Sequence, residues 1–240
     1  MVTMPHDVIP HDSWAGVYDL AYEASFGRFY TELTEATLAV VNSYVSPPAA
    51  IVDFGAGTGR LALPLSRQGY EVTAVDASQK MLDQLAAKDL HNSISRTAAL
   101  ISNFRGIERF DLALCVFTVI SYLLDEGALQ SSFQRMYESL KPGGYLILDV
   151  PSKAVFHGYS SMEGDLARRV EVTESSSDLY SYSERIDFGE TTFRDDFAIR
   201  YWELTAVMKV ASDTGFTLEK DLSRAFTGAG ARYFVLRKTN

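Results

Sequence analysis

The sequence predicts an α/β fold built on a Rossmann-like, doubly wound sheet, and two patterns point to it. Between residues 51 and 150, short apolar runs of strand length alternate with helix-compatible segments, as in parallel strands joined by crossover helices. From residue 152 to residue 201, apolar and polar residues alternate one by one, which is typical of antiparallel strands. We therefore expect a seven-stranded sheet whose last strand is antiparallel, with a small antiparallel insert after the fifth strand.

The first apolar run, Ile51 to Phe54, leads into a turn with glycine at positions 55, 57 and 59. Glycine lets the backbone adopt positive φ and lets a ligand lie against bare main chain. The helix-compatible stretch Leu61 to Gln68 follows, so free N–H groups at its start face whatever lies over the turn. Tyr70 to Asp76 is expected to be the second strand, and its terminal carboxylate suits the two hydroxyls of a ribose. Together these features predict a nucleoside site.

The remaining elements are expected from runs of similar length. Phe110 to Phe117 is a nearly continuous apolar run, as in a central parallel strand covered on both faces. Residues 118–123 leave its carboxyl end, where ligands of open α/β sheets collect. Further strands are expected near residues 94–104, 145–150, 217–222 and 233–238, and further helices at 31–44, 80–88, 129–140 and 202–214.

Composition limits the classes of protein. The chain has 240 residues with 47% hydrophobic residues, which suits one large domain and opposes disorder. Its net charge of −9 opposes nucleic-acid binding, because phosphate contacts need clustered Lys and Arg. Met1 to Asp12 does not resemble a signal peptide, and no apolar run reaches membrane-spanning length. We expect a cytoplasmic monomer or homodimer that acts on a small molecule, without a metal ion and without a membrane or nucleic-acid partner.

The spacing of the glycines separates two kinds of nucleoside site. The dinucleotide fingerprint Gly-x-Gly-x-x-Gly requires a glycine where this chain has Arg60. Here Asp53 precedes the first of three alternate glycines by two positions, and this arrangement resembles the S-adenosylmethionine site of class I methyltransferases. The sequence Leu-Lys-Pro-Gly-Gly at residues 140–144, directly before an apolar strand, also resembles that family. The resemblance covers about residues 51–150.

The resemblance implies S-adenosylmethionine as the cofactor, with the glycine turn against its methionine part and Asp76 on its ribose. Family members commonly have an acid beside the adenine at the end of the third strand. This chain has Leu100-Ile101-Ser102-Asn103 there, so backbone groups and apolar packing are expected instead. The residues expected to bind the cofactor are Tyr18, Arg28, Asp53, Gly55, Ala56, Gly57, Gly59, Asp76, Ala77, Met81, Leu100, Ile101, Phe117 and Thr118.

Residues 13–46 are expected to form a helical cover rich in aromatic side chains. Tyr18-Asp19-x-x-Tyr22 resembles a segment of small-molecule methyltransferases that covers the cofactor, and Arg28 is a candidate partner for the methionine carboxylate. Ahead of this cover, His6, Asp7, His11 and Asp12 fit no metal-binding spacing, so a mobile tail is expected there.

Residues 152–202, which contain the alternating strands, are expected to form a substrate lid. The candidates for catalytic residues are Tyr22, Tyr122 and His157. The cover and the insert together resemble the amino-sugar and glycine-type N-methyltransferases, which implies methyl transfer to a nitrogen by in-line displacement. An O-methyltransferase, a nicotinamide-dependent oxidoreductase and a non-catalytic S-adenosylmethionine-binding module remain open as alternatives.

Overall fold

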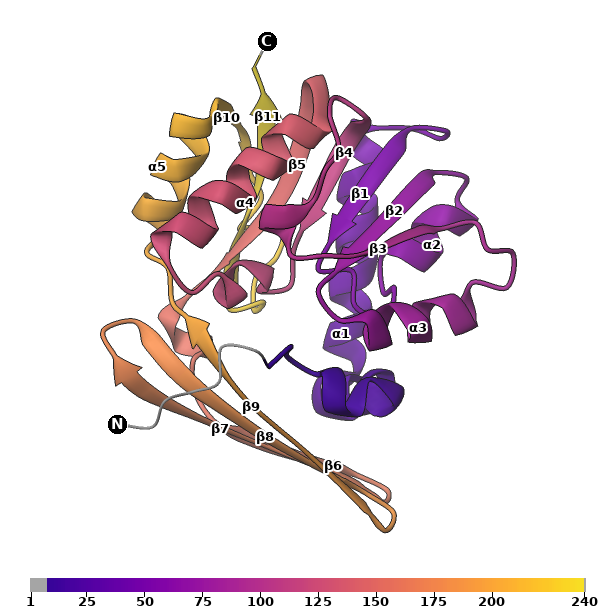
Figure 1. Ribbon diagram of the computed structural model, residues 1–240, viewed down its shortest axis with the longest axis vertical. Coiled ribbons are helices and arrows are strands. Elements are labelled where there is room, and N and C mark those ends of the chain that lie inside the picture. Colours follow the sequence, from indigo (N-terminus) through magenta and orange to yellow (C-terminus); the bar gives the residue numbers. More distant parts are fainter. Residues whose placement is uncertain (1–7, 240) are drawn as a thin grey trace.

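In a computed structural model, which describes residues 8–239, the chain forms two sheets (Figure 1). The large sheet has seven strands in the order β10-β11-β5-β4-β1-β2-β3, and the small sheet has four in the order β6-β7-β8-β9. The strands are β1 (Ala50–Phe54), β2 (Glu71–Asp76), β3 (Ser95–Ala98), β4 (Phe110–Cys115), β5 (Leu140–Pro151), β6 (Tyr159–Glu163), β7 (Leu166–Ser176), β8 (Leu179–Phe188), β9 (Thr191–Arg200), β10 (Phe216–Asp221) and β11 (Ala231–Lys238).

The helices connect these strands as the sequence pattern predicts. The α-helices are α1 (Tyr18–Tyr44), α2 (Ala62–Arg67), α3 (Gln79–Lys88), α4 (Glu126–Ser139) and α5 (Leu204–Thr214). Short 3₁₀ helices are η1 (Asp12–Val17), η2 (Ile101–Asn103), η3 (Val119–Tyr122) and η4 (Lys153–Val155).

The large sheet is doubly wound around β1, which pairs in parallel with β2 on one side and β4 on the other. Strand β11 runs antiparallel to β5, so the predicted fold class is confirmed. Strand order reverses at β1, and the carboxyl ends of β1, β2 and β4 therefore meet at the edge where such sheets bind ligands.

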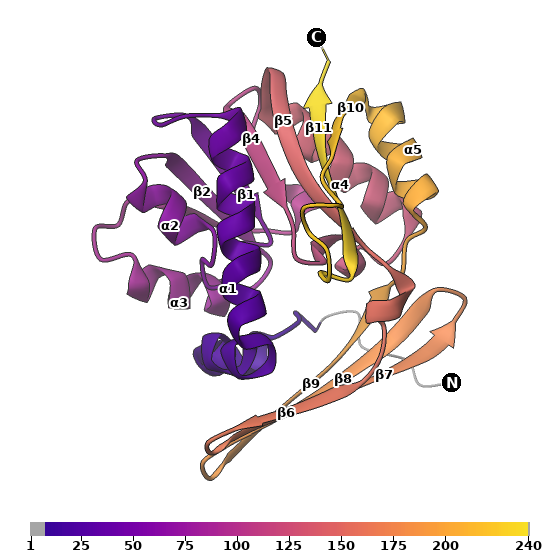
Figure 2. The same cartoon turned by 180° about the vertical axis from the view of Figure 1, so that it is seen from behind.

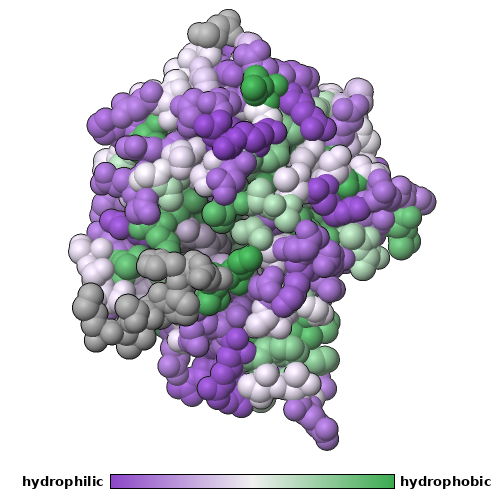
Figure 3. Space-filling model, in the orientation of Figure 1, coloured by the Kyte–Doolittle hydropathy of each residue, from purple (hydrophilic) through white to green (hydrophobic). Residues whose placement is uncertain are grey.

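Helices cover both faces of the large sheet, as Figures 1 and 2 show from opposite sides. Successive side chains of a strand point to opposite faces of the sheet. Val52 therefore lies in the apolar cluster that includes Phe133 of α4, and Ile51 lies in the cluster that includes Val41 of α1. The surface in Figure 3 is mostly hydrophilic, in keeping with the acidic composition.

The small sheet lies across the carboxyl edge of the large sheet, beside η1 and the start of α1 (Figures 1 and 2). The side chains of Leu166 and Ile186 form one apolar cluster with Trp14 and Tyr22. The small sheet therefore packs directly against the N-terminal segment, although more than 100 residues separate them in the chain.

Three local expectations differ from the structure. Helix α1 begins at Tyr18 rather than near residue 31, with an irregular Gly27 inside it at φ +47°. Strand β3 ends at Ala98 and gives way to η2, and β5 already begins at Leu140, because the Lys-Pro-Gly-Gly segment extends the strand instead of preceding it. Among residues 8–239, no helix is long and apolar enough to cross a membrane.

The predicted mobile tail is wrong for the part of it that the structure describes. His11 is only 6% exposed, and Asp12 forms an ion pair with Lys80. The partners of both residues lie far away in the chain, so local spacing could not reveal them. His6 and Asp7 lie outside the described residues.

Candidate functional site

The glycine turn between β1 and α2 presents an open stretch of backbone. Gly55 and Gly59 have positive φ, and a Cβ added to either would lie 2.4 Å from Val119 Cγ2 or 2.9 Å from Leu85 Cγ, respectively. At Gly57, which also has positive φ, a Cβ would approach Met81 Cε at an ordinary 3.7 Å. The outer glycines therefore serve protein packing, whereas a Cβ at Gly57 would make only an ordinary contact with Met81.

Asp76 ends β2 directly beside this turn. Its Oδ2 accepts a hydrogen bond from Gly57 N at 2.8 Å, and its Oδ1 accepts one from Ser78 N at 2.8 Å. Burial raises the pKa of Asp76, while the N–H groups of Ser78 and Gly57 oppose that shift. The carboxylate is thus fixed in orientation by backbone donors and retains lone pairs for further donors.

The segment after Asp76 is equally ordered by backbone hydrogen bonds. Ser78 caps α3, because its Oγ accepts a hydrogen bond from Met81 N at 3.1 Å. Met81 is buried beneath the turn, and Ala77 lies between Asp76 and Ser78 in the chain. On the adenine side expected from the sequence, Ile101 is buried in the core and Leu100 is 58% exposed.

Two further carboxylates, Asp53 and Asp149, lie buried near the carboxyl ends of β1 and β5. Burial raises the pKa of each to about 7, and the charge of Arg60 opposes the shift in both cases. Asp149 accepts hydrogen bonds from Thr118 N at 3.0 and 3.1 Å. It thereby holds Phe117 and Thr118, whose φ values of +71° and +65° cost on the order of 1–2 kcal/mol each.

Sequence reasoning did not single out Asp149. The sequence does carry a signal for it. Asp149 ends the apolar strand after the Lys-Pro-Gly-Gly segment, and an acid inside a buried strand is unusual. The strained turn that it supports carries two of the predicted cofactor-binding residues to the same edge as Gly57.

Of the two arginines near the site, Arg60 and not Arg28 reaches the glycine turn. The Arg28 side chain is 90% exposed and pairs with Glu32. Arg60 lies over the rings of Phe117 and Tyr30, at 4.8 and 5.2 Å from the ring centroids. A cavity of about 250 Å³ beside it is lined by Asp19, Glu23, Gly27, Tyr30, Thr31 and Arg60.

Two acids hold the N-terminal cover against this edge: Asp12, just ahead of the cover, and Asp19 within it. Asp12 accepts a hydrogen bond from Ser78 Oγ at 2.7 Å and pairs with Lys80 at 2.8 Å. Asp19 accepts one from Thr58 Oγ1, inside the glycine turn, at 2.5 Å. It also pairs with Lys88 of α3 at 2.6 Å. The cover therefore spans both the turn and the helix after Asp76.

Aromatic rings form the inner wall of the cover. Tyr18 and Tyr22 stack with centroids 4.2 Å apart, and Tyr22 also lies 5.8 Å from the ring of Phe117. Tyr122, from η3, contacts the same group of rings through His11, whose ring centroid lies 6.0 Å from its own. Tyr18 and Tyr22 of α1 are thus brought together with Phe117 and Tyr122 of the segment that follows β4.

His157 is placed differently from the two candidate catalytic tyrosines. It is exposed, and its Nδ1 lies 2.7 Å from the carbonyl oxygen of Ala154. Among the described residues, no hydrogen bond joins it to Tyr22 or Tyr122. Within residues 8–239, no cluster of three or more His, Cys, Asp or Glu side chains has the geometry of a metal site.

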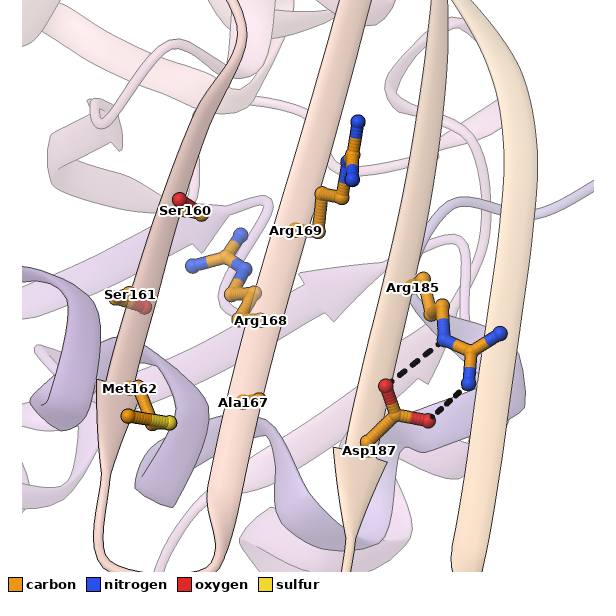
Figure 4. Close-up of a pocket in the computed structure, with 8 residues that line it drawn as sticks. All are labelled: Ser160, Ser161, Met162, Ala167, Arg168, Arg169, Arg185 and Asp187. Carbon is orange, nitrogen blue, oxygen red and sulfur yellow. Dashed lines mark hydrogen bonds and ion pairs between the residues drawn. The ribbon is translucent and has the colours of Figure 1, made fainter.

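A second cavity, of about 630 Å³, lies on the small sheet (Figure 4). Arg168 and Arg169 leave neighbouring positions of β7 in different directions, and Arg185 makes a two-pronged contact with Asp187 at 2.7 and 2.8 Å. The lining residues are Ser160, Ser161, Met162, Ala167, Arg168, Arg169, Arg185 and Asp187.

Comparison with known proteins agrees with this geometry. Residues 51–144 match the methyltransferase domain family. A Geobacillus sp. protein designated a methyltransferase is 36% identical over 104 residues, 42% of each chain. The ubiquinone biosynthesis O-methyltransferase of Rickettsia akari is 30% identical over 100 residues, 41% of this chain and 38% of its own. The chain spans about half the length of the curated relatives it matches.

Solved structures extend the likeness to the whole fold. A methyltransferase from Clostridium acetobutylicum superposes with a TM-score of 0.80 at 18% identity, over 94% of this chain and 99% of its own. A sugar N-methyltransferase from Streptoalloteichus sp. superposes with a TM-score of 0.76 at 19% identity, over 100% of both chains. Residues 51–144 therefore match a methyltransferase domain family, and the chain as a whole shares the fold of these solved methyltransferases.

Proposed function

We propose that the protein transfers a methyl group from S-adenosylmethionine to a nitrogen atom of a small molecule. The observation that carries this proposal is the wall formed by the rings of Tyr18, Tyr22 and Phe117 at the carboxyl edge of the sheet. Aromatic faces stabilise cations. Transfer to an amine moves a positive charge from sulfur to nitrogen and conserves it, so such a wall suits reactants and product. Transfer to a phenolate would instead remove the charge.

The extent of the structural likeness supports the same reading. The sugar N-methyltransferase resembles this chain over its full length, including the cover and the insert. The relatives named as O-methyltransferases match it in sequence over about 100 residues. The cover and the insert are the parts that distinguish methyltransferases with different acceptors, because the sheet itself holds the shared cofactor.

The residues around Gly57 fit S-adenosylmethionine. Gly57 has no side chain to crowd a ligand against the main chain, and Asp76, fixed by backbone donors beside it, is the residue proposed to accept the two hydroxyls of a ribose. Arg60 takes the place expected of Arg28 as the cation at the turn. The cofactor, when bound, supplies an electrophilic methyl group on a positively charged sulfur. The chain's own part is to orient the acceptor and exclude water.

We further propose that residues 13–46 and 152–202 close the site together. Asp12 and Asp19 hold the cover over α3 and the glycine turn, and the insert packs against the cover through Leu166 and Ile186. On this proposal the acceptor binds between the aromatic wall and the inner face of the insert. Tyr22 and Tyr122 are the candidate residues at that boundary.

Two measurements test the proposal. Calorimetry with S-adenosylmethionine, S-adenosylhomocysteine and NADPH should show binding of the first two ligands alone. Formation of S-adenosylhomocysteine should then be followed with glycine and glucosamine as amine probes and catechol as the oxygen probe. Turnover with an amine supports the proposal. Turnover with catechol alone assigns O-methylation, NADPH binding favours the oxidoreductase, and cofactor binding without turnover favours a binding module.

A further inference from the structure

A buried chain of hydrogen bonds connects three distant parts of the sequence at the covered edge. Tyr122 Oη lies 2.8 Å from His11 Nε2, and His11 Nδ1 lies 3.1 Å from Glu184 Oε2. The other oxygen of Glu184 accepts a hydrogen bond from Arg168 Nε at 2.6 Å. The side chains of Arg168 and Glu184 are fully buried, and that of His11 is 8% exposed.

The charge on Glu184 decides the direction of these hydrogen bonds. Burial raises the pKa of Glu184, but the hydrogen bonds and charges of His11 and Arg168 outweigh burial and leave it below its ordinary value. An ionised carboxylate only accepts, so His11 Nδ1 carries the proton and donates to Glu184. The Nε2 lone pair of His11 is then free to accept from the hydroxyl of Tyr122.

Tyr122 is kept in the form that this arrangement requires. Burial, with smaller contributions from Tyr22 and Glu184, raises its pKa well above the ordinary value, so it remains a phenol that donates to His11. Its hydroxyl oxygen keeps a lone pair for a second donor. The titratable and charged groups that face His11 come from every element around it and are Tyr18, Tyr22, Asp76, Tyr122, Arg168, Glu184 and Asp195.

Packing of the cover against the insert does not require the buried charged groups of Arg168 and Glu184. Burying an ion pair costs desolvation free energy that apolar packing avoids, and an apolar joint of similar shape is often at least as stable. The rings of Trp14 and Phe197 already surround His11 at 5.1 and 5.2 Å, so an apolar environment is available. The polar chain also ends at Tyr122, at the carboxyl edge of β4, next to the strained Phe117–Thr118 turn.

We propose that His11 accepts the proton of the methyl acceptor through Tyr122, with Glu184 and Arg168 as positioning residues. This inference rests on the proposed function. The acceptor's ammonium gives its proton to Tyr122 Oη as the phenol proton passes to His11 Nε2, which leaves a neutral amine and an imidazolium paired with Glu184. The nitrogen–carbon bond then forms as the sulfur–carbon bond breaks, and its electron pair stays on sulfur. His11 returns its proton to solvent.

The relay matters because most amines are protonated at neutral pH, as the ordinary lysine pKa of about 10.4 illustrates. A positioned proton acceptor typically contributes about 10²- to 10⁴-fold to a rate. The effect should vanish at a pH where the amine is already neutral, and this dependence separates a proton acceptor from a residue that only supports the fold.

The test compares kcat/KM against pH for the wild-type enzyme, His11→Gln and Glu184→Gln with glucosamine and glycine, using His91→Gln on the exposed surface as the matched control. We expect His11→Gln to lose at least 10²-fold near pH 7 and to approach the wild-type rate as the pH nears the pKa of the amine. His91→Gln should follow the wild-type profile. An equal loss at every pH in His11→Gln, with KM for S-adenosylmethionine unchanged, would overturn the relay.

A second measurement needs no acceptor and separates failure of the relay from failure of the proposed function. Nitrogen-15 NMR of the full chain should show the His11 ring as a single tautomer protonated at Nδ1, and Glu184→Gln should abolish that preference. A His11 signal that titrates as a mixture of tautomers, like that of a free imidazole, overturns the relay. If only catechol is turned over, N-methylation fails, whereas the relay still predicts recovery of His11→Gln near the phenol pKa.

Discussion

At the glycine turn, the polar groups are the Asp76 carboxylate and the backbone N–H groups of Gly57 and Ser78 that donate to it, all within residues 53–78. On the opposite side, the polar groups are the connected side chains of Tyr122, His11, Glu184 and Arg168, with the Tyr22 ring against Arg168, and they come from four separate stretches of the chain. The first half of the site depends on local backbone geometry. The second half depends on the docking of two segments that have no sequence proximity to each other.

This difference has an energetic consequence. Backbone donors at a strand end and a helix start are satisfied within the core and persist when the cover moves away. The Arg168–Glu184 pair lies within the insert, on β7 and β8, but its remaining partners are His11, just ahead of the cover, and Ser25 of the cover, so these contacts depend on docking. We therefore expect the covering half to open at a lower free energy than the core.

The largest expected effect comes from breaking that pair. Glu184→Ala leaves the Arg168 guanidinium buried without its counter-charge, which costs about 3–5 kcal/mol. Hydrogen exchange should show loss of protection in residues 11–30 and in β7 and β8, while β1 and β4 stay protected. Asp187→Ala, at the exposed pair with Arg185, is the control and should leave exchange unchanged. Equal loss across both sheets would mean that the two halves form one cooperative unit.

The second prediction concerns pH and the core half. Asp53 and Asp149 have a pKa of about 7 in the folded chain, against an ordinary 3.8. Between these values the folded state binds more protons than the unfolded state, so the free energy of unfolding falls as pH rises from about 4 to 7. The expected loss is roughly 2–4 kcal/mol per group.

Asp149→Asn tests this sign directly. The amide oxygen of Asn still accepts from Thr118 N, so the strained turn keeps its support. The variant should equal the wild type in urea denaturation below about pH 4 and exceed it in stability by a growing margin up to about pH 7 and beyond, for example at pH 8. A stability difference that is constant between these pH values would mean that Asp149 is ionised throughout.

The third prediction addresses cofactor affinity. Asp76→Ala removes a charged acceptor from the ribose side of the site and should weaken S-adenosylhomocysteine binding by roughly 1.5–3 kcal/mol, measured by calorimetry. Asp83→Ala, on the exposed face of the adjoining α3, is the matched control. Unchanged affinity in the Asp76 variant would remove this residue from the ribose site.

The two halves also differ in how far the sequence could predict them. The glycine turn, Asp53 and Asp76 were predicted because their spacing within about 25 residues is fixed by one strand–turn–helix–strand unit. The sequence pattern places His11 in a mobile tail and assigns Arg60 no role in the site. No local pattern marks the partners of His11 at residues 122 and 184, and Arg60 was considered only as the replacement of a third glycine. Arg28 points into solvent and pairs with Glu32 one helical turn later in α1.

The smallest expected effect compares two glycines of the turn. Both have positive φ, so Gly57→Ala and Gly59→Ala each carry a backbone cost on the order of 1 kcal/mol. Only at Gly59 would the new Cβ also lie 2.9 Å from the Leu85 side chain, whereas at Gly57 it would project into the space assigned to the cofactor. Gly59→Ala should therefore lower the free energy of unfolding further, measured by urea denaturation. Gly57→Ala should be the variant that loses cofactor affinity in calorimetry after correction for stability. If Gly57→Ala binds S-adenosylhomocysteine as tightly as the wild type, the turn supports the fold and the cofactor lies elsewhere on the edge.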